Sequence, residues 1–189
     1  MNNAAKFTLH TKESAPAGSK ELLDSVENNF GFMPILFRNT AEAPVVLKSL
    51  LTMMDLTSQT SFTPAQQQIA ALAVSVENDC INCMAGHCVL GQMQEAHEQT
   101  LDELFTHHGV NINDAQDRAL AEFARSVTKN RGRQPKEDVE AFLAAGFTKE
   151  QVFEVMLIVA YKTLTNYTNH LTDSPADDEM LQAIQTNAA

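Results

Sequence analysis

The sequence contains no tryptophan, and only 7 glycines and 6 prolines occur among its 189 residues. So few turn-forming residues argue against a turn-rich β fold. Basic residues are also scarce, with 13 Lys and Arg against 24 Asp and Glu and a net charge of −11. Because a nucleic-acid groove needs clustered basic side chains, we expect no nucleic-acid partner. The length and the 44 % hydrophobic content instead indicate one globular domain.

Long hydrophobic runs are absent as well. The longest is VMLIVAY, over residues 155–161, which is far shorter than the ~20 residues that a bilayer span requires. The first residues, MNNAAKFTLHTKES, contain no apolar signal segment. We therefore expect a cytoplasmic protein that does not enter a membrane.

Helical periodicity recurs along the chain, and no segment alternates with period two for long enough to predict a strand. Thr63 followed by Pro64 has the pattern of a helix start, as does Thr148. Residues 1–18 are polar and lack a period, which predicts a flexible arm, with a single helical domain over residues 19–189. The fold class is therefore all-α, with about eight helices. We expect them over 19–28, 44–56, 65–76, 100–107, 114–130, 135–145 and 148–166, with one more starting near residue 80.

The three cysteines, Cys80, Cys83 and Cys88, lie within nine residues, so they cannot form disulfides that join distant loops. On an ideal helix with about 100° per residue, Cys80, Cys83 and His87 share a face that spans about 60°. Cys88 points elsewhere. Residues three and four apart lie ~5–6 Å from each other. Cys80 and Cys83 can therefore close a disulfide, and His87 can hydrogen-bond Cys83.

The thiolate is the reactive form of cysteine. A helix N-terminus favours the thiolate through its dipole, and His87 favours it by accepting the thiol proton and remaining as a cation. Asp79 opposes both effects, because a carboxylate beside Cys80 raises the pKa of its thiol. Cys83 is closer to His87, so we predict that it is the nucleophile, with Cys80 as proton donor or resolving thiol.

Two other interpretations of this segment stay open. Small buried cysteines are common in helix cores and have no chemical role. Zinc is the second, because Cys80, Cys83 and His87 supply three ligands and Cys88 or His97 would be the fourth. The sequence has no further Cys pair or His-x-x-x-His pair to complete a tetrahedron. We therefore expect neither a metal nor a separate cofactor.

The segment LAVSVENDCINCMAGHCVLG resembles the signature of the alkylhydroperoxidase AhpD-like, carboxymuconolactone decarboxylase superfamily. NFGFMPILFRNTAEAP before it, and AEFARSVTKNRGRQPKEDVEAFLAAGFTKEQVFEVMLIVA and NYTNHLTDSP after it, resemble further segments of its peroxidase-related members. Together they cover about residues 28–179. The resemblance implies an AhpD-like all-helical fold and a homo-oligomer, either a trimer or a hexamer.

The resemblance also implies a reaction and its residues. Cys83 would attack a small hydroperoxide and become a sulfenic acid, with His87 as the base. Cys80 would donate a proton and then resolve the sulfenic acid to a redox-active Cys80–Cys83 disulfide. An external dithiol, of the dihydrolipoamide or thioredoxin type, would reduce this disulfide.

The chain departs from the AhpD pattern at two positions. Gln68 occupies the position of a proton-relaying Glu, and Asn82 that of a His before the second Cys. A Gln side chain cannot carry a proton at neutral pH. Glu77 could act as the relay instead if the preceding helix continued through Asn78. His170, in the NYTNH segment, is expected near the cysteine helix, in a packing role rather than a catalytic one.

The leading hypothesis is therefore a thiol-dependent peroxide reductase of the antioxidant type. One alternative is a non-redox enzyme similar to carboxymuconolactone decarboxylase, which would not use the cysteine pair. Another is a redox-sensing protein in which the disulfide changes the assembly rather than turning over a substrate.

Overall fold

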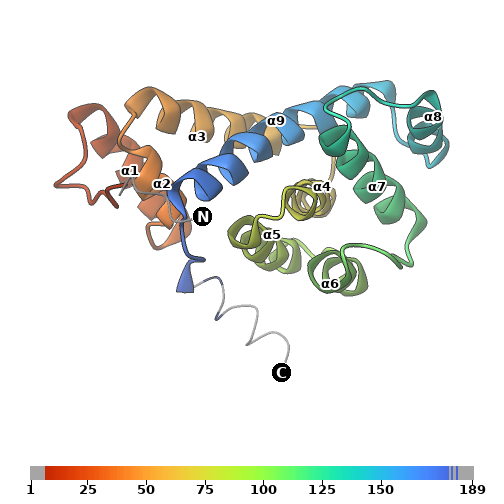
Figure 1. Cartoon of the computed structure of the whole chain (residues 1–189), viewed down its shortest axis with the longest axis horizontal. Coiled ribbons are helices and arrows are strands. Elements are labelled where there is room, and N and C mark those ends of the chain that lie inside the picture. Colours follow the sequence, from red (N-terminus) through yellow and green to blue (C-terminus); the bar gives the residue numbers. More distant parts are fainter. Residues whose placement is uncertain (1–6, 179, 181, 183–189) are drawn as a thin grey trace.

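The computed structural model describes residues 7–178, 180 and 182, and within them the chain forms nine helices and no strand (Figure 1). The all-α prediction is confirmed. In chain order the helices are α1 (Ala17–Phe30), α2 (Ile35–Thr40), α3 (Pro44–Ser58), α4 (Pro64–Glu77), α5 (Ile81–Met93), α6 (Glu98–His107), α7 (Ala115–Lys129), α8 (Lys136–Ala144) and α9 (Lys149–Thr172).

Two of the helix starts follow the local signals in the sequence. Thr63 accepts a hydrogen bond from the N–H of Gln66, and the Gln66 side chain accepts one from the N–H of Thr63. Thr148 and Gln151 form the same reciprocal pair at the start of α9. Each capping box satisfies N–H groups that have no partner within the helix, which fixes where the helix begins.

The additional helix, α2, lies between the helices expected over 19–28 and 44–56, where the sequence analysis places no helix. Pro34 precedes it with φ −59°, and the N–H of Ile35 donates to Oδ1 of Asp177 at 2.9 Å. A first-turn N–H has no partner within its helix, so this carboxylate stabilises the start of α2. The partner lies more than a hundred residues along the chain, and a local pattern cannot reveal it.

The ends of α1 and α9 also differ from the prediction. α1 begins after Pro16, because the hydroxyl of Ser19 donates to the carbonyl of Ala41 at 2.7 Å instead of capping the helix. α9 continues past residue 166 to Thr172. Even so, no helix in the described part of the chain is both long and apolar enough to cross a bilayer.

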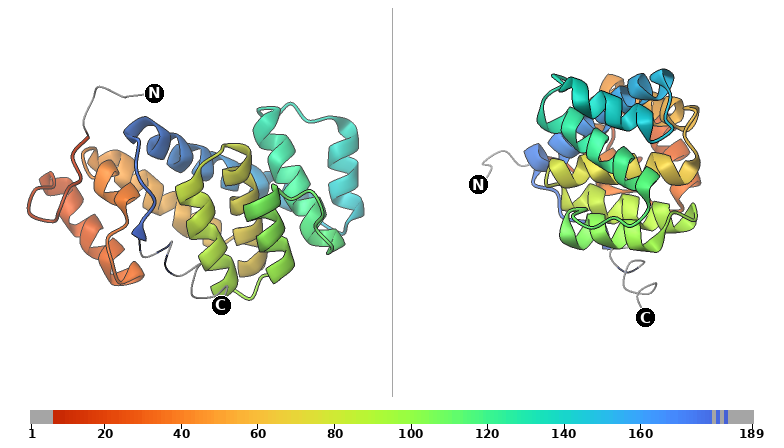
Figure 2. Two further views of the ribbon diagram at one scale, coloured as in Figure 1. Left: turned by 60° about the horizontal axis from the view of Figure 1, so that its bottom comes forward. Right: turned by 90° about the vertical axis from the view of Figure 1, so that its right-hand side faces the viewer.

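α4 lies at the centre of the fold, with α5, α6, α7 and α9 packed around it (Figure 1). Every residue over 69–76 is buried, and several of them are alanines that allow close packing. α1, α2 and α3 form one end of the molecule, and α9 runs from there to α7 and α8 (Figure 2). α9 contributes Val155 and Ile158 to the buried cluster around α4, and Tyr161 to the cluster formed by α1, α2 and α3. The middle of α9 therefore lies between two hydrophobic clusters.

The predicted arm over residues 1–18 lies partly outside the described part, which begins at residue 7. His10 is buried, with its Nε2 2.8 Å from Oε2 of Glu42, and its backbone N–H donates to the carbonyl of Arg38. The described part of this segment is thus packed beside α2. The boundary expected at residue 19 falls inside α1.

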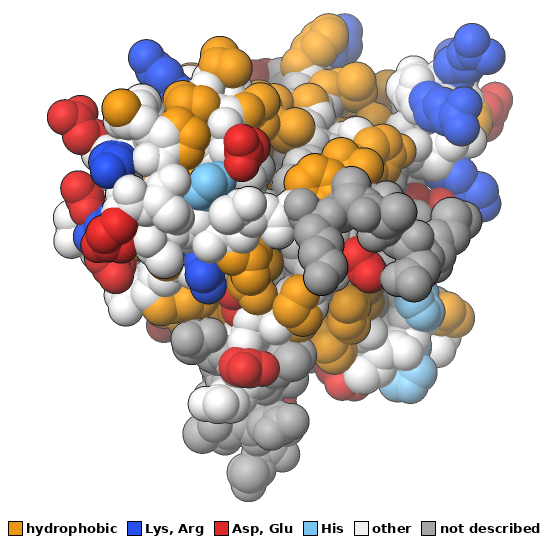
Figure 3. Space-filling model, turned by 60° about the vertical axis from the view of Figure 1, so that its left-hand side comes forward, with side chains coloured by type: hydrophobic (Ala, Val, Ile, Leu, Met, Phe, Trp, Pro, Cys, Tyr) orange, Lys and Arg blue, Asp and Glu red, His pale blue; other side chains and the backbone are white. Residues whose placement is uncertain are grey.

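On the face shown in Figure 3, hydrophobic side chains gather in the upper half, and others lie below its centre. Val45 on α3 and Phe153 on α9 are among the exposed hydrophobic residues, at 73 % and 74 %. Scattered residues of this kind are ordinary, whereas a contiguous patch marks an interaction surface. The oligomeric state of the protein, a trimer or a hexamer, stays a prediction.

Candidate active site

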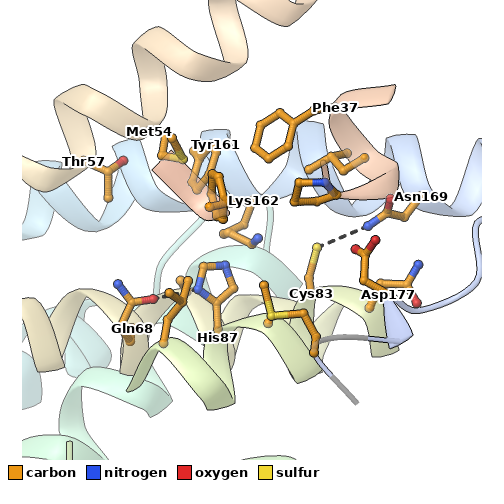
Figure 4. Close-up of a pocket in the computed structure, with 18 of the residues that line it drawn as sticks. Phe37, Met54, Thr57, Gln68, Cys83, His87, Tyr161, Lys162, Asn169 and Asp177 are labelled. Atoms are coloured by element: carbon orange, nitrogen blue, oxygen red, sulfur yellow. Dashed lines mark hydrogen bonds between the residues drawn. The ribbon is translucent and has the colours of Figure 1, made fainter. Parts of the chain in front are cut away.

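A cavity of about 210 Å³ lies where α2, α3, α4, α5 and α9 meet (Figure 4). Its walls are mostly apolar, and Phe30, Phe37, Met54 and Tyr161 contribute to them. Of the three cysteines, only Cys83 lines the cavity. An apolar cavity with a few polar groups on its wall is the usual form of a site for a small organic molecule.

Cys80 and Cys83 are brought together by the way α5 begins. Asp79 has a left-handed conformation, with φ +54°, and turns the chain out of α4. Cys80 then occupies the N-cap position, where its N–H donates to the carbonyl of Ser75 at 2.9 Å. Both Sγ atoms accept from Nδ2 of Asn169 on α9, at 3.7 Å for Cys80 and 3.4 Å for Cys83. The predicted pair therefore lies close together as two buried cysteines that form no disulfide.

The surroundings of the two sulfurs favour different protonation states. A hydrogen bond from the Cys80 thiol, with smaller contributions from the Lys162 ammonium and the Thr165 hydroxyl, holds the pKa of Cys83 well below its usual range, against the effect of burial. The same hydrogen bond, together with burial, raises the pKa of Cys80. These surroundings favour the thiolate at Cys83 and the thiol at Cys80, and the roles of the two cysteines stay a prediction.

Lys162 is the residue of the site that the sequence analysis missed. It lies on α9 and is only 2 % exposed, and its ammonium points between His87 and Cys83 (Figure 4). Its Nζ also lies 5.1 Å from the centroid of the Tyr161 ring. One feature of the sequence could have revealed it. Lys162 follows the buried Ile158 by one helical turn and therefore lies on the inward face of α9. A lysine on such a face needs a functional or electrostatic explanation.

His87 is buried and hydrogen-bonds Gln68 rather than Cys83. Its Nδ1 lies 2.9 Å from Oε1 of Gln68, and an amide oxygen only accepts, so Nδ1 carries the proton and Nε2 has the lone pair. Burial, and secondly the charge of Lys162, hold the pKa of His87 well below its usual range. The sequence predicts that His87 is the cation beside Cys83; burial and the charge of Lys162 instead favour the neutral imidazole.

Replacing Gln68 by Glu should raise the pKa of His87 from its depressed value. A carboxylate that accepts from Nδ1–H stabilises the imidazolium, whereas an amide does not. The measurement is the titration of the His87 ring protons by NMR. Gln66→Glu is the matched control, because it adds the same charge to the same helix while a Glu still completes the capping box of Thr63. A pKa of His87 that moves equally in both variants would contradict the assigned hydrogen bond.

The structure does not bring Glu77 or His170 into the cavity. Oε2 of Glu77 pairs with Nε of Arg125 on α7, 3.2 Å away, so this carboxylate is not placed to relay protons to His87. Nε2 of His170 lies 3.3 Å from the carbonyl of Asp79 at the start of α5. His170 therefore contacts the turn that positions the cysteines, and not the cavity.

Asn82, the second departure from the AhpD pattern, holds the C-terminal segment. Its Nδ2 donates to the carbonyls of Ser174 and Pro175, at 2.7 Å and 2.8 Å. Two residues further on, Asp177 lines the cavity close to Asn169 (Figure 4). Asn82 therefore lines the cavity itself and also holds the chain that forms one side of it, and an amide is suited to that contact because it donates to carbonyls.

Cys88 is buried away from the cavity. Burial, and secondly the charge of Asp102, raise the pKa of its thiol, so it stays protonated. For the zinc interpretation, the described residues contain one group of His, Cys, Asp or Glu ligand atoms within 4.8 Å of one another, formed by His97, Asp114 and Asp117. None of the cysteines belongs to that group.

Thr57, at the cavity wall, has a buried hydroxyl without a hydrogen-bond partner among the described residues. Replacing Thr57 by Val, which has nearly the same shape, should leave the free energy of unfolding unchanged or raise it by about 1 kcal/mol. Thr60→Val is the control, because the Thr60 hydroxyl donates to the carbonyl of Thr57 and accepts from Gln67, so its loss should destabilise the protein by about 1–3 kcal/mol. Denaturant unfolding of both variants measures the difference, and equal destabilisation would contradict the assignment.

No protein-family model and no curated protein matches this sequence. Solved structures match its fold. An uncharacterised peroxidase-related protein from Ralstonia eutropha JMP134, described as an AhpD core, gives a TM-score of 0.82 at 21 % identity over 93 % of each chain. A peroxidase-related protein from Silicibacter sp. TM1040 gives 0.78 at 17 % identity, over 95 % of this chain and 97 % of that one.

A third structure, the debrominase Bmp8 in complex with 2,3,4-tribromopyrrole, gives a TM-score of 0.79 at 14 % identity over 98 % of each chain. The chain therefore has the AhpD-like helical fold, which confirms the fold that the resemblance implies. Sequence identities this low establish the fold, and the reaction has to be argued from the site itself.

Proposed function

We propose that the protein is a thiol-dependent peroxide reductase in which Cys83 is the nucleophile and Cys80 the resolving thiol. The observation that carries the proposal is the placement of Cys83. It is the cysteine on the wall of an apolar cavity, its pKa is lowered, and a protonated thiol lies beside it. The similarity of the fold to AhpD and peroxidase-related proteins supports the same class of reaction.

The reaction proceeds in two steps on these sulfurs. The Cys83 thiolate attacks the outer oxygen of a hydroperoxide, the O–O bond breaks, and a sulfenic acid and an alkoxide form. The Cys80 thiol then attacks the Cys83 sulfur, water leaves, and the disulfide forms. An external dithiol reduces the disulfide by thiol–disulfide exchange.

His87 and the cavity wall orient the substrate. Nε2 of His87 has a free lone pair, because Nδ1–H is held by Gln68. We assign Nε2 to accept a hydrogen bond from the O–H of the hydroperoxide, which directs the outer oxygen toward Cys83. The apolar walls then surround the organic group, so an organic hydroperoxide should react faster than hydrogen peroxide.

Reductive removal of a halogen from an organic substrate is a second candidate reaction for this protein. It is favoured by the similarity to a debrominase over 98 % of both chains and by the aromatic side chains of the cavity, Phe30, Phe37 and Tyr161. Releasing bromine as bromide and replacing it with hydrogen takes two electrons, and the oxidation of two thiols to a disulfide supplies two.

One experiment separates these reactions. The reduced protein is supplied with dithiothreitol and either cumene hydroperoxide or 2,3,4-tribromopyrrole, and peroxide loss or bromide release is followed. Catalytic loss of the hydroperoxide supports the first candidate, and bromide release the second. Disulfide formation without turnover, with a change in oligomer size, would favour the redox-sensing alternative. A protein that does none of these would leave the non-redox, decarboxylase-like alternative.

A further inference from the structure

The attack of Cys83 on a hydroperoxide releases an alkoxide inside a largely apolar cavity, and this strong base needs a proton. The question of which residue supplies it rests on the proposed function. The resemblance assigns a proton-donating role to Cys80. In the structure Cys80 does not line the cavity, and its thiol hydrogen-bonds Cys83. Its proton is therefore directed at the attacking sulfur and not at the leaving oxygen.

Other polar groups on the wall are not suited to the task. His87 is neutral, and its one N–H is held by Gln68. The amides of Gln68 and Asn169 donate hydrogen bonds but do not give up protons. Asp177 is an acceptor there, since its Oδ1 receives the N–H of Ile35. The hydroxyl of Tyr161 is a weaker acid than usual, because burial and the charge of Cys83 raise its pKa.

Lys162 differs from all of these. It is 2 % exposed, it lines the cavity, and its ammonium points between Cys83 and His87 (Figure 4). No carboxylate among the described residues forms an ion pair with it. A buried ammonium without an anionic partner needs a negative charge in the cavity, and the thiolate and then the alkoxide provide one.

The geometry points to Lys162 as the general acid that protonates the leaving oxygen. The Cys83 thiolate takes the outer OH of the hydroperoxide, so that the S–O bond forms as the O–O bond breaks. The alkoxide takes a proton from the Lys162 ammonium and leaves as the alcohol, and the lysine becomes a neutral amine. When the external dithiol reduces the disulfide, the Cys83 thiol that forms returns a proton to this amine, which restores the thiolate and the ammonium.

The test compares two oxidants whose leaving groups differ in whether they need a proton. Peracetic acid releases acetate, a weak base that leaves unaided, whereas tert-butyl hydroperoxide releases a strongly basic alkoxide. In Lys162→Met, oxidation of Cys83 by tert-butyl hydroperoxide should slow by about a hundredfold more than oxidation by peracetic acid. Lys162→Arg keeps the positive charge but cannot release a proton, so it should show the same selective loss. Lys149→Met, at an exposed position on α9, is the matched control and should react like the wild type.

The outcomes separate this proposal from the proposed function. If both oxidants slow equally in Lys162→Met, or only Tyr161→Phe shows the selective loss, Lys162 is not the acid. If Lys162→Arg reacts like the wild type, charge alone explains the effect and the proposal is overturned as well. A wild-type protein that neither oxidant converts to the disulfide would instead contradict the peroxide reductase function. Circular dichroism of each variant establishes that it has folded.

Discussion

Replacing Cys83 by Ser should lower the rate of hydroperoxide reduction by about a thousandfold or more, because a hydroxyl cannot take the place of the attacking thiolate. Cys83 lines the cavity, and the hydrogen bond from Cys80, the charge of Lys162 and the hydroxyl of Thr165 all favour its ionised form. A Ser hydroxyl stays protonated in the same environment. The measurement is the rate of cumene hydroperoxide consumption with dithiothreitol as the electron donor.

Cys88→Ser is the matched control for this variant. Cys88 lies on the same helix and is similarly buried, at 5 % exposure against 7 % for Cys83, but it does not line the cavity. The control should therefore retain nearly all of the activity. If the two Ser variants lose activity to the same extent, the loss reflects packing in α5 and not the chemistry of Cys83.

Replacing Cys80 should have two effects that can be measured separately. Without a resolving thiol, the Cys83 sulfenic acid should accumulate after one equivalent of hydroperoxide, and a dimedone adduct of Cys83 detects it by mass spectrometry. Without the hydrogen bond from the Cys80 thiol, which is the largest cause of the lowered pKa of Cys83, that pKa should rise. The reaction of Cys83 should then slow as the pH falls through the neutral range, where the wild-type thiolate persists.

Cys80→Ala and Cys80→Ser distinguish the two effects. Both remove the resolving sulfur, so both should accumulate the sulfenic acid. Only Ala removes the hydrogen-bond donor, so the pKa of Cys83 should rise more in Cys80→Ala than in Cys80→Ser. The ultraviolet absorbance of the thiolate, followed against pH, reports this difference. Equal pKa values in the wild type and Cys80→Ala would show that the thiol of Cys80 does not stabilise the thiolate.

The parts of the fold that could be predicted are those that local chemistry determines. Thr63 and Thr148 begin helices because each satisfies N–H groups within a few residues of itself. α2 could not be predicted, because its first turn is stabilised by the carboxylate of Asp177 near the other end of the chain. α1 begins earlier than expected because the hydroxyl of Ser19 has a partner elsewhere.

In the site, too, the features set by neighbouring residues could be predicted, and those set by distant residues could not. Cys80 and Cys83 are three residues apart, so helical geometry alone places them together. Glu77, which could have acted as the relay if its helix continued through Asn78, instead pairs with Arg125, because α4 packs on α7. Lys162 was missed because a lysine in an apolar helix is ordinarily expected to reach solvent. Only the arrangement of α5 against α9 shows that its ammonium faces a thiolate.

The central claim is that Cys80 and Cys83 act as a redox pair. It is tested most directly by adding one equivalent of cumene hydroperoxide to the fully reduced protein, with intact-mass measurement and peptide mapping over time. Cys80 and Cys83 should lose two hydrogens together and form a disulfide, while Cys88 stays a thiol. If all three cysteines stay reduced, or oxidise slowly and without preference, the pair is not a peroxidatic centre and the account is wrong.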